Sequence, residues 1–364
     1  MRLSDVTLRE GDQLPGREFT ADQKLTCARA LDDLGLDYVQ AGFPATGETD
    51  QRVLSELAGT TDAEVIGLAR ALDRDVDAVL DTDADVVELF VSVSDRHLDR
   101  LLGKTREEMH EMLAGAVEHV HDRGGTAHVT LADAFRTPAE DVLAVEEAIP
   151  EVEYLTLADT VGARTPRSVR EYLDTLGEAV DLGRVGVHFH DDLDCATANV
   201  LAAADAGVGK ADVSVAGLGE RAGNSPLESV VVAAGVDATV DFGVDESALI
   251  PTCRQVLETL GEEWDDRRAV LGETVSEHES AIHTTAMLSD PATMEAYDPE
   301  RFGGERRLVF GASTGTSGAR KLLDRAGVEV TDDAVAAYTE ALADHGPLGL
   351  DGALDLARAT VGRE

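Results

Sequence analysis

The 364-residue chain is long enough for one barrel-sized domain of roughly 250 residues and an appendix of about 100. Its 72 acidic and 31 basic residues give a formal net charge of −41, which works against binding to nucleic acid or to an anionic membrane. No apolar run approaches the ~18 residues of a membrane span, no signal peptide is apparent and the three cysteines form no CxxC pair, so we expect a cytoplasmic protein.

The negative charge is spread along the whole chain, because acidic residues interleave with apolar positions. That distribution is typical of a folded surface and not of a disordered tail. Lysine is almost absent, and arginine supplies most of the positive charge. Such a surface is typical of proteins from a salt-saturated cytoplasm, where screening makes mutual repulsion tolerable. We therefore expect a halophilic protein, and the charge describes habitat more than function.

Short β-rich runs recur up to residue 217, and the segments between them, such as 21–36 and 106–122, carry apolar residues at helical spacing. Strand and helix alternating around eight strands predict an α/β fold, a parallel (β/α)8 TIM barrel with its helices outside. A doubly wound open sheet is the alternative, but no GxGxxG follows the first strand. The expected strands are 3–8, 38–43, 64–69, 86–91, 127–132, 154–159, 185–190 and 211–217.

The strand signal fades after about residue 245, and helical patterns dominate the rest of the chain. Residues 327–342 contain a helix start, with Thr331 or Asp332 as the N-cap, and the Gly-rich stretch 310–323 is expected to be a loop entering a helix. We therefore predict a catalytic barrel domain over 1–244 and a mainly helical C-terminal subdomain over 245–364.

Polar residues that could do chemistry stand at the ends of several predicted strands. Catalytic groups of a parallel β/α barrel lie at the C-terminal ends of its strands. The first strand ends in Arg9 and Glu10, and the sixth in Asp159 and Thr160. The seventh strand ends in His188 and His190, and the eighth leads into GLGERAGN, which contains Glu220, Arg221 and Asn224.

The histidine pair on the seventh strand has a definite geometry. Residues two apart on a strand point to the same side, so His188 and His190 both face the barrel mouth. Two imidazoles and a carboxylate from another strand end form a site suited to Zn, Mn, Co or Fe. Asp191 and Asp192 are either acceptors that orient these histidines or two further surface acids.

Two other motifs allow more than one interpretation. GLGERAGN is a Gly-rich turn entering a helix near 225–226, and its backbone N–H groups also suit an anion. His278 and His283 are five residues apart, a spacing that does not share a helical face well and argues against a paired metal role.

These motifs resemble the 2-isopropylmalate, homocitrate and citramalate synthases, the acyl-CoA-condensing branch of the DRE-TIM metallolyase-like superfamily. The resemblance runs in order from residue 4 to about 325 and rests on DVTLREGDQ, SVSDRHLDRLLGKTREE, LADTVGARTP, GVHFHDDLDCATAN, GLGERAGNSPLE and YDPERFGGERRLVFGASTG. The chain shows no counterpart of the large regulatory domain that many isopropylmalate synthases carry, so we expect no such domain.

The resemblance implies a metal-dependent acyltransferase of amino-acid biosynthesis, working as a homodimer. A 2-oxo acid would chelate a divalent cation (Mg, Mn, Zn or Co), and the enolate of acetyl-CoA would attack its ketone before the thioester is hydrolysed. Arg9 would stabilise the developing oxyanions. The implied metal ligands are Glu10, His188 and His190, with Asn224 nearby. Besides Arg9, the implied substrate-binding residues are Thr160, Thr130 and His97. The groups that would assist proton transfer across the dimer interface are His283 and Tyr297.

Departures from the family pattern concern the acetyl-CoA half of the reaction. Where the family has Ser-x-Glu-Asp, this chain has Thr130-Leu131-Ala132-Asp133, so Ala132 replaces a glutamate that helps proton abstraction. Asp133 would face the other side of a regular strand. The family's His-Asn-Asp is altered at Asp191, and its GKHSG-like motif is not recognisable in residues 311–318.

Specificity signals conflict. Glu10 in REG resembles homocitrate synthases, whereas AGFPATGETD (41–50) resembles isopropylmalate and citramalate synthases. His128 stands where homocitrate synthases place an arginine for the second carboxylate of their substrate, so a monocarboxylic 2-oxo acid is favoured. The alternatives to a condensing enzyme are an aldol-type lyase of the same superfamily and a non-catalytic oxo-acid-binding paralogue, the latter indicated by Ala132.

Overall fold

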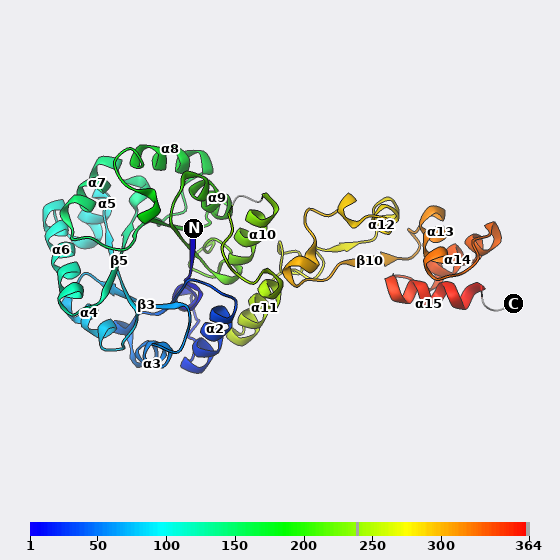
Figure 1. Cartoon of the computed structure of the whole chain (residues 1–364), viewed down its shortest axis with the longest axis horizontal. Helices are drawn as coiled ribbons and strands as arrows, with labels where there is room; N and C mark the ends of the chain where they lie inside the picture. Colours follow the sequence, from blue (N-terminus) through cyan, green and yellow to red (C-terminus); the bar gives the residue numbers. More distant parts are fainter. Residues whose placement is uncertain (238–239, 362–364) are drawn as a thin grey trace. The chain divides into compact units, whose positions relative to one another are not determined.

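A computed structural model of the chain describes residues 1–237 and 240–361 (Figure 1). The chain forms two compact units, Met1–Glu263 and Trp264–Glu364. None of the helices in the described residues is both long enough and apolar enough to span a membrane.

The first unit is a closed barrel of parallel strands, which confirms the predicted TIM barrel and excludes the open sheet. The strands follow one another around the barrel in chain order, and β1 pairs with both β2 and β8. Their buried residues are mostly Val, Leu, Ile and Ala, as expected for a sheet covered by helices. The strands are β1 (Arg2–Asp5), β2 (Tyr38–Gly42), β3 (Glu64–Arg70), β4 (Val86–Ser92), β5 (Thr126–Ala132), β6 (Leu155–Asp159), β7 (Val185–Phe189) and β8 (Lys210–Val213).

Helices cover the outside of the barrel, and Figure 1 shows them as a ring around the strands. Local sequence fixes several of their starts. Thr20 and Thr105 each form a capping box, with Gln23 and Glu108 respectively, which satisfies backbone donors at the helix N-terminus. The main helices are α2 (Ala21–Asp33), α3 (Glu48–Leu57), α4 (Asp73–Leu80), α6 (Arg106–Asp122), α7 (Ala139–Ala148), α8 (Pro166–Leu176), α9 (Ala196–Ala206), α10 (Leu227–Asp237) and α11 (Leu249–Leu260).

The first unit extends beyond the expected boundary at residue 244, because α11 packs against α2. The side-chain amide of Gln23 donates to the backbone carbonyl of Thr259 at 2.7 Å, and Cys27 Sγ lies 3.8 Å from the carbonyl of Val256. Cys253 of α11 is also buried. A helix that covers the barrel belongs to the barrel unit, although its sequence pattern resembles that of the C-terminal region.

The first strand is shorter than its sequence pattern predicts. β1 ends at Asp5, and the one-turn helix α1 (Thr7–Glu10) carries Arg9 and Glu10, so the expected strand is present but its expected end at residue 8 is wrong. The side chain of Asp5 accepts hydrogen bonds from the backbone N–H and the hydroxyl of Thr7, at 2.9 and 2.8 Å. These local bonds turn the chain out of the sheet.

The second unit is mainly helical, as predicted, and also contains a small sheet. Its helices include α12 (Ala281–Met287), α13 (Thr316–Arg325), α14 (Asp332–His345) and α15 (Leu350–Val361). Thr331 is the N-cap of α14, and residues 311–315 form the loop that leads into α13, so both predictions are confirmed. The strands are β9 (Glu277–His278), β10 (Arg307–Phe310) and β11 (Leu348–Gly349).

Candidate metal centre at the barrel mouth

Glu10, His188 and His190 come together at the C-terminal end of the barrel. Their candidate ligand atoms all lie within 4.8 Å of one another, and all three residues are buried. The Nε2 atoms of the two histidines are 3.3 Å apart, and His188 Nε2 is 3.7 Å from Glu10 Oε1. A carboxylate and two imidazoles at these distances are a suitable donor set for a divalent cation.

The position of Glu10 depends on the hydrogen bonds that tie α1 to the end of β8. The hydroxyl of Thr7 donates to Asp5 and accepts from the backbone N–H of Val215 at 2.8 Å. Burial raises the pKa of Asp5 to about 7, with the nearby Asp212 and Glu228 acting in the same direction. The turn that carries Arg9 and Glu10 is therefore fixed to two strands of the barrel.

The charges around the cluster favour the protonation states in which its side chains can bind a metal ion. Burial opposes ionisation of Glu10, but the adjacent Arg9 and the two histidines outweigh it and lower the pKa of this carboxyl. Burial and the neighbouring His188 lower the pKa of His190 to about 3. At neutral pH the cluster thus presents a carboxylate and a neutral imidazole, which are the forms that bind metal.

Two orphaned oxygen atoms fit a bound cation. Glu10 Oε2 and Asn224 Oδ1 are buried and have no hydrogen-bond partner among the described residues. The amide nitrogen of Asn224 donates to the carbonyl of Leu218 at 3.1 Å, so the side-chain oxygen of Asn224 is the atom without a hydrogen-bond partner among the described residues. Asn224 also pairs with His190 through the backbone. Buried acceptors without donors are costly unless a cation or water satisfies them.

Arg9 lies beside this cluster and is held on two sides. Its Nε donates to Gln40 Oε1, and its Nη1 donates to Glu10 Oε1. The side chain is 13% exposed, so it is not fully sealed from solvent. A planar, permanently charged donor in this position suits an anionic substrate group.

The end of β5 differs from the sequence expectation for Asp133. Asp133 does not continue the strand, because its backbone is left-handed, with φ 64° and ψ 26°. Its carboxylate is engaged by Arg136 and Ser94, at 2.6 and 2.5 Å. Burial opposes ionisation, but these hydrogen bonds outweigh it and lower the pKa of Asp133. Asp133 is therefore held in a structural cluster. It does not take the place of the family's glutamate, which Ala132 replaces in this chain.

The three expected substrate-binding residues lie on β5 and the segments that follow β4 and β6. Thr160 Oγ1 accepts from the backbone N–H of Asp133 at 2.8 Å. His97 Nε2 lies 3.6 Å from Asp133 Oδ2. Thr130 donates to Glu88 Oε1 at 2.8 Å inside the barrel. Thr160 and His97 thus share contacts with Asp133, whereas the half-buried Thr130 contacts Glu88.

A residue that the sequence interpretation missed orients the first histidine. His188 Nδ1 lies 3.1 Å from Asp212 Oδ2 on β8. Asp191 instead accepts from the backbone N–H of Ala196 at the start of α9, at 2.7 Å, and Asp192 forms an ion pair with Arg221 at 2.9 Å. The sequence signal for this role was the presence of two charged residues, Lys210 and Asp212, at alternate positions of an otherwise apolar strand.

The GLGERAGN loop needs its glycines for close backbone approach. Gly223 has a φ of 89°, and a Cβ there would meet the carbonyl oxygen of Gly217 at 1.9 Å. The backbone N–H of Asn224 donates to that same carbonyl at 2.9 Å. The N–H of Ala216, just before the loop, donates to Glu228 Oε2 at 3.0 Å. The turn interpretation is confirmed.

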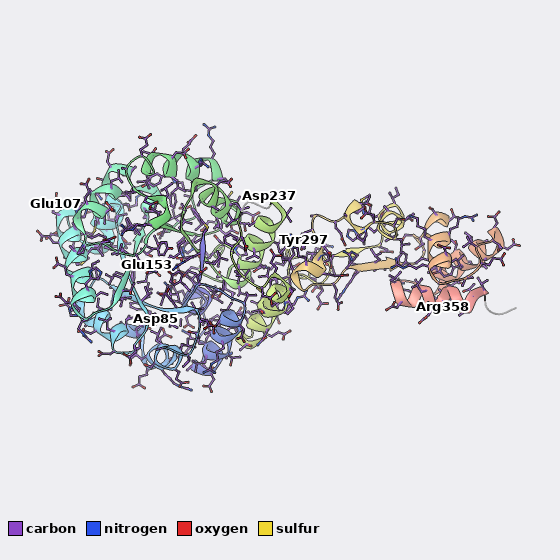
Figure 2. All side chains as sticks on the ribbon, in the orientation of Figure 1. Asp85, Glu107, Glu153, Asp237, Tyr297 and Arg358 are labelled. Carbon is purple, nitrogen blue, oxygen red and sulfur yellow. The ribbon has the colours of Figure 1, made fainter. Side chains whose placement is uncertain are left out.

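His283 and Tyr297 belong to the second unit, Trp264–Glu364. His283 is exposed on α12, with its ring 6.1 Å from that of His278. Tyr297, labelled in Figure 2, is half-buried and packs its ring 5.7 Å from that of Phe302. Burial raises the pKa of Tyr297. Their part in catalysis stays a prediction.

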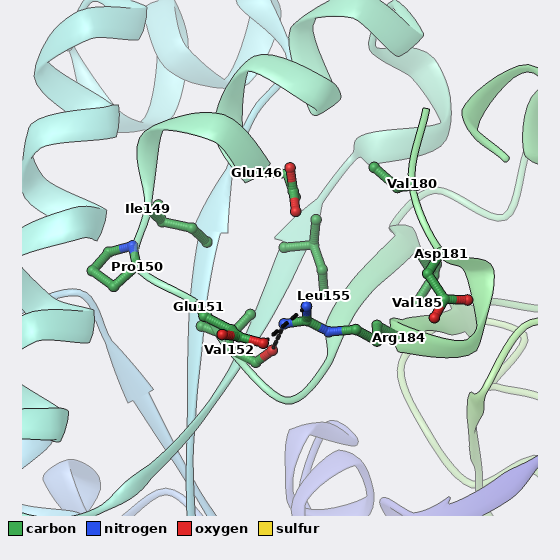
Figure 3. A pocket seen from close by; sticks show the side chains of 10 residues that line it. All are labelled: Glu146, Ile149, Pro150, Glu151, Val152, Leu155, Val180, Asp181, Arg184 and Val185. Atoms are coloured by element: carbon green, nitrogen blue, oxygen red, sulfur yellow. Dashed lines mark hydrogen bonds and ion pairs between the residues drawn. The ribbon is translucent and has the colours of Figure 1, made fainter. Parts of the chain in front are cut away.

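A cavity of about 350 Å³ lies away from this centre, at the N-terminal ends of β6 and β7 (Figure 3). Arg184 crosses it and donates to the carbonyl of Val152 at 2.6 Å, while also pairing with Glu151 at 3.0 Å. Apolar residues such as Ile149 and Leu155 form much of the remaining wall. Its one lining cation is already paired, so this cavity offers no chemistry comparable to that of the barrel mouth.

Comparisons with known proteins agree with this geometry. The family model described as HMGL-like matches residues 1–256, and one described as homocitrate synthase post-HMGL domain-like matches residues 270–347. A protein named as an (R)-citramalate synthase, from Methanopyrus kandleri, is 39% identical over 340 residues, covering 92% of this chain and 66% of that protein. Homocitrate synthase AksA from Methanosarcina acetivorans is 37% identical over 337 residues, covering 90% of this chain and 81% of that protein.

A solved structure supports the fold. The HMG-CoA lyase from Bacillus subtilis superposes with a TM-score of 0.65 at 22% identity, covering 72% of this chain and 94% of the lyase. The sequence resemblance to the condensing synthases is confirmed by the family matches and the curated relatives. The chain therefore belongs to the HMGL-like family, in the group that carries the homocitrate synthase post-HMGL domain.

Proposed function

We propose that the chain is a metal-dependent acyltransferase that condenses acetyl-CoA with a 2-oxo acid. The observation that carries the proposal is the cluster of Glu10, His188 and His190 beside Arg9, at the mouth of a barrel shared with named citramalate and homocitrate synthases. Such a reaction belongs to amino-acid biosynthesis and extends a carbon chain by one acetyl unit.

The proposed reaction forms one carbon–carbon bond and breaks one thioester. The methyl group of acetyl-CoA loses a proton, the resulting enolate attacks the ketone carbon, and the ketone oxygen is protonated. Water then cleaves the thioester and releases free CoA. Thermodynamic drive comes from the hydrolysis, so the condensation is irreversible in practice.

The residues of the barrel mouth take distinct roles in this scheme. Glu10, His188 and His190 would hold the cation with Asn224 close by, and a bound cation would supply Lewis-acid polarisation and orientation of the ketone. Arg9 donates hydrogen bonds to oxygen atoms that gain negative charge during attack. Thr160, Thr130 and His97 bind the oxo acid.

Charge balance supports a monocarboxylic 2-oxo acid. Arg9 and Lys210 face Glu10, Glu88 and Asp212, so this buried group carries one net negative charge. A divalent cation and one substrate carboxylate bring that total to zero. Both of these interior cations are already paired, and burial and the charge of Lys210 lower the pKa of His128 to about 3, which leaves it neutral. A second substrate carboxylate would therefore be poorly compensated.

We also propose a homodimer as the working form, in which His283 and Tyr297 assist proton transfer. The support is their match to a histidine and a tyrosine of the condensing synthases. Mixing an inactive Glu10→Gln protein with an inactive Tyr297→Phe protein should restore part of the activity if subunits share a site. Mixtures no more active than their components would contradict a shared site.

The experiment for the activity is release of free CoA from acetyl-CoA in the presence of pyruvate, 2-oxoisovalerate or 2-oxoglutarate. Mg, Mn, Zn and Co are each supplied in turn. Release with a monocarboxylic acid is expected, and silence across the whole panel would overturn the proposal. Cleavage of a 3-hydroxy-3-methyl acyl-CoA would identify a lyase, whereas metal and oxo-acid binding without turnover would identify a non-catalytic paralogue.

A further inference from the structure

The barrel interior holds a chain of buried polar side chains that begins at Arg9. Gln40 accepts from Arg9 Nε and donates through its own amide nitrogen to Glu88 Oε2. The other oxygen of Glu88 accepts from Lys210 Nζ at 3.1 Å and from Thr130 Oγ1 at 2.8 Å. This first arm links the substrate-facing guanidinium to a lysine in the centre of the barrel.

A second arm runs from the same lysine to the metal cluster. Lys210 Nζ lies 3.5 Å from Asp212 Oδ1, and Asp212 Oδ2 lies 3.1 Å from His188 Nδ1. His188 then meets Glu10 through its other ring nitrogen. Lys210 is fully buried and Asp212 is 3% exposed, so water does not replace these contacts. The two arms and the ion pair between Arg9 and Glu10 close a ring.

The lysine is the element on which both arms depend. Burial disfavours its charged form, but Asp212 and Glu88 outweigh burial and raise the pKa of Lys210. Removing the ammonium would leave two buried carboxylates without their shared counter-charge, a strongly unfavourable arrangement. The carboxylates would then move or attract water, and the hydrogen bonds to His188 and Gln40 would move with them.

We infer that Asp212 and Lys210 are positioning residues for His188, and that Lys210 ties the metal cluster to Arg9; this inference rests on the proposed metal site. Asp212 accepts a hydrogen bond from His188 Nδ1–H and thereby keeps Nε2 unprotonated and aimed at the cation. Lys210 fixes the carboxylate of Asp212 on one side. Through Glu88 and Gln40 it fixes the guanidinium of Arg9 on the other. Neither Asp212 nor Lys210 touches a reacting atom.

The chain contains a matched control for this arrangement. Lys24 is also fully buried and forms ion pairs with Asp50, at 2.6 Å, and with Asp12. No hydrogen bond among the described residues links Lys24 and its two aspartates to His188 or His190. Replacing Lys24 therefore removes an equivalent buried ammonium without disturbing the support of His188.

The test measures metal affinity and not turnover. Zn²⁺ and Mn²⁺ affinities are obtained by competition with a chromophoric chelator for the full-length wild type and for Asp212→Asn, Lys210→Met and Lys24→Met, together with thermal unfolding of each. Asp212→Asn and Lys210→Met should lose about 10- to 100-fold in metal affinity. Lys24→Met should lose stability but keep the affinity of the wild type.

Nitrogen NMR of the metal-free protein gives a second readout. In the wild type the His188 proton should reside on Nδ1, and in Asp212→Asn it should move to Nε2, because the amide donates where the carboxylate accepted. Asp212→Asn is nearly isosteric and carries the test alone should Lys210→Met fail to fold. Unchanged affinities, an unchanged tautomer or an equal affinity loss in Lys24→Met would overturn the inference. A wild type that binds neither metal would instead overturn the proposed function, and this inference with it.

Discussion

Glu10 Oε1 lies 3.7 Å from His188 Nε2, so the turn that follows the first strand meets the seventh strand at the barrel mouth. Closure of the barrel creates this contact, because β1 pairs with β8, and β8 pairs with β7. Arg9 neutralises Glu10 from one side and leaves its second oxygen without a hydrogen-bond partner among the described residues. A carboxylate held in this way is available to a cation.

Replacing Glu10 by glutamine should weaken metal binding and condensation together. An amide oxygen is a poorer ligand than a carboxylate, and the loss in both metal affinity and kcat/KM should be on the order of 100-fold or more. The matched control is Glu151→Gln, at an exposed carboxylate near the N-terminal ends of the strands. Wild-type metal affinity in Glu10→Gln, measured by calorimetry, would rule this residue out as a ligand.

Replacing Arg9 by lysine should reduce kcat/KM by about 100-fold, equivalent to about 2.7 kcal/mol of transition-state stabilisation. Lysine keeps the charge but cannot donate to Gln40 and Glu10 from one planar group as Arg9 does. Steady-state rates of CoA release measure the effect. An Arg9→Lys enzyme as active as the wild type would show that charge alone suffices.

Asp133→Asn should lower the free energy of unfolding by about 1–3 kcal/mol, because Arg136 then loses its buried counter-charge. The control is Asp95→Asn, at an ion pair with Arg106 in which the aspartate side chain is 91% exposed. Exposed pairs contribute at most about 1 kcal/mol. Urea unfolding of both variants makes the comparison, and equal losses would contradict a structural role for Asp133.

His128 should contribute to acid sensitivity of the fold. Burial lowers its pKa from 6.5 to about 3. Between these two pKa values the unfolded chain binds a proton that the folded chain does not. Stability is therefore lost as the pH falls from 6.5 towards about 3. His128→Phe should flatten the pH dependence of unfolding free energy by up to about 1.4 kcal/mol per pH unit. The exposed His345→Gln is the control, and an unchanged slope in His128→Phe would contradict the expectation.

Salt should stabilise the protein strongly. At a net charge of −41, repulsion between surface carboxylates opposes the folded state, and raising the salt from 0.1 to 1 M shortens the Debye length from about 10 to 3 Å. Thermal unfolding in increasing KCl should therefore show a rising Tm. A matched series in sucrose controls for general exclusion effects. A constant or falling Tm would contradict this expectation.

Much of the fold could be predicted because its signals are local. The helix predicted over 106–122 is α6, Arg106–Asp122, and the capping box at Thr105 marks its start. The grouping of Glu10 with the His188–His190 pair could be predicted from topology, since closing the barrel brings them to one end. These successes need only the period of the pattern and the direction of the strands.

The remainder depends on contacts between distant residues, which the pattern does not contain. The early end of β1 comes from hydrogen bonds between Asp5 and Thr7. In the sequence Asp212 cannot be distinguished from the many other acidic residues. Only the fold places it next to His188 and Lys210. The left-handed backbone of Asp133, likewise, is set by its contacts with Arg136 and Ser94.

The most direct test of the metal centre is a crystal structure of the protein grown with Mn²⁺, with anomalous data. The account predicts one strong peak at about 2.0–2.3 Å from a carboxylate oxygen of Glu10 and from Nε2 of His188 and His190. A peak bound by other residues, or none at the barrel mouth at saturating Mn²⁺, would contradict it.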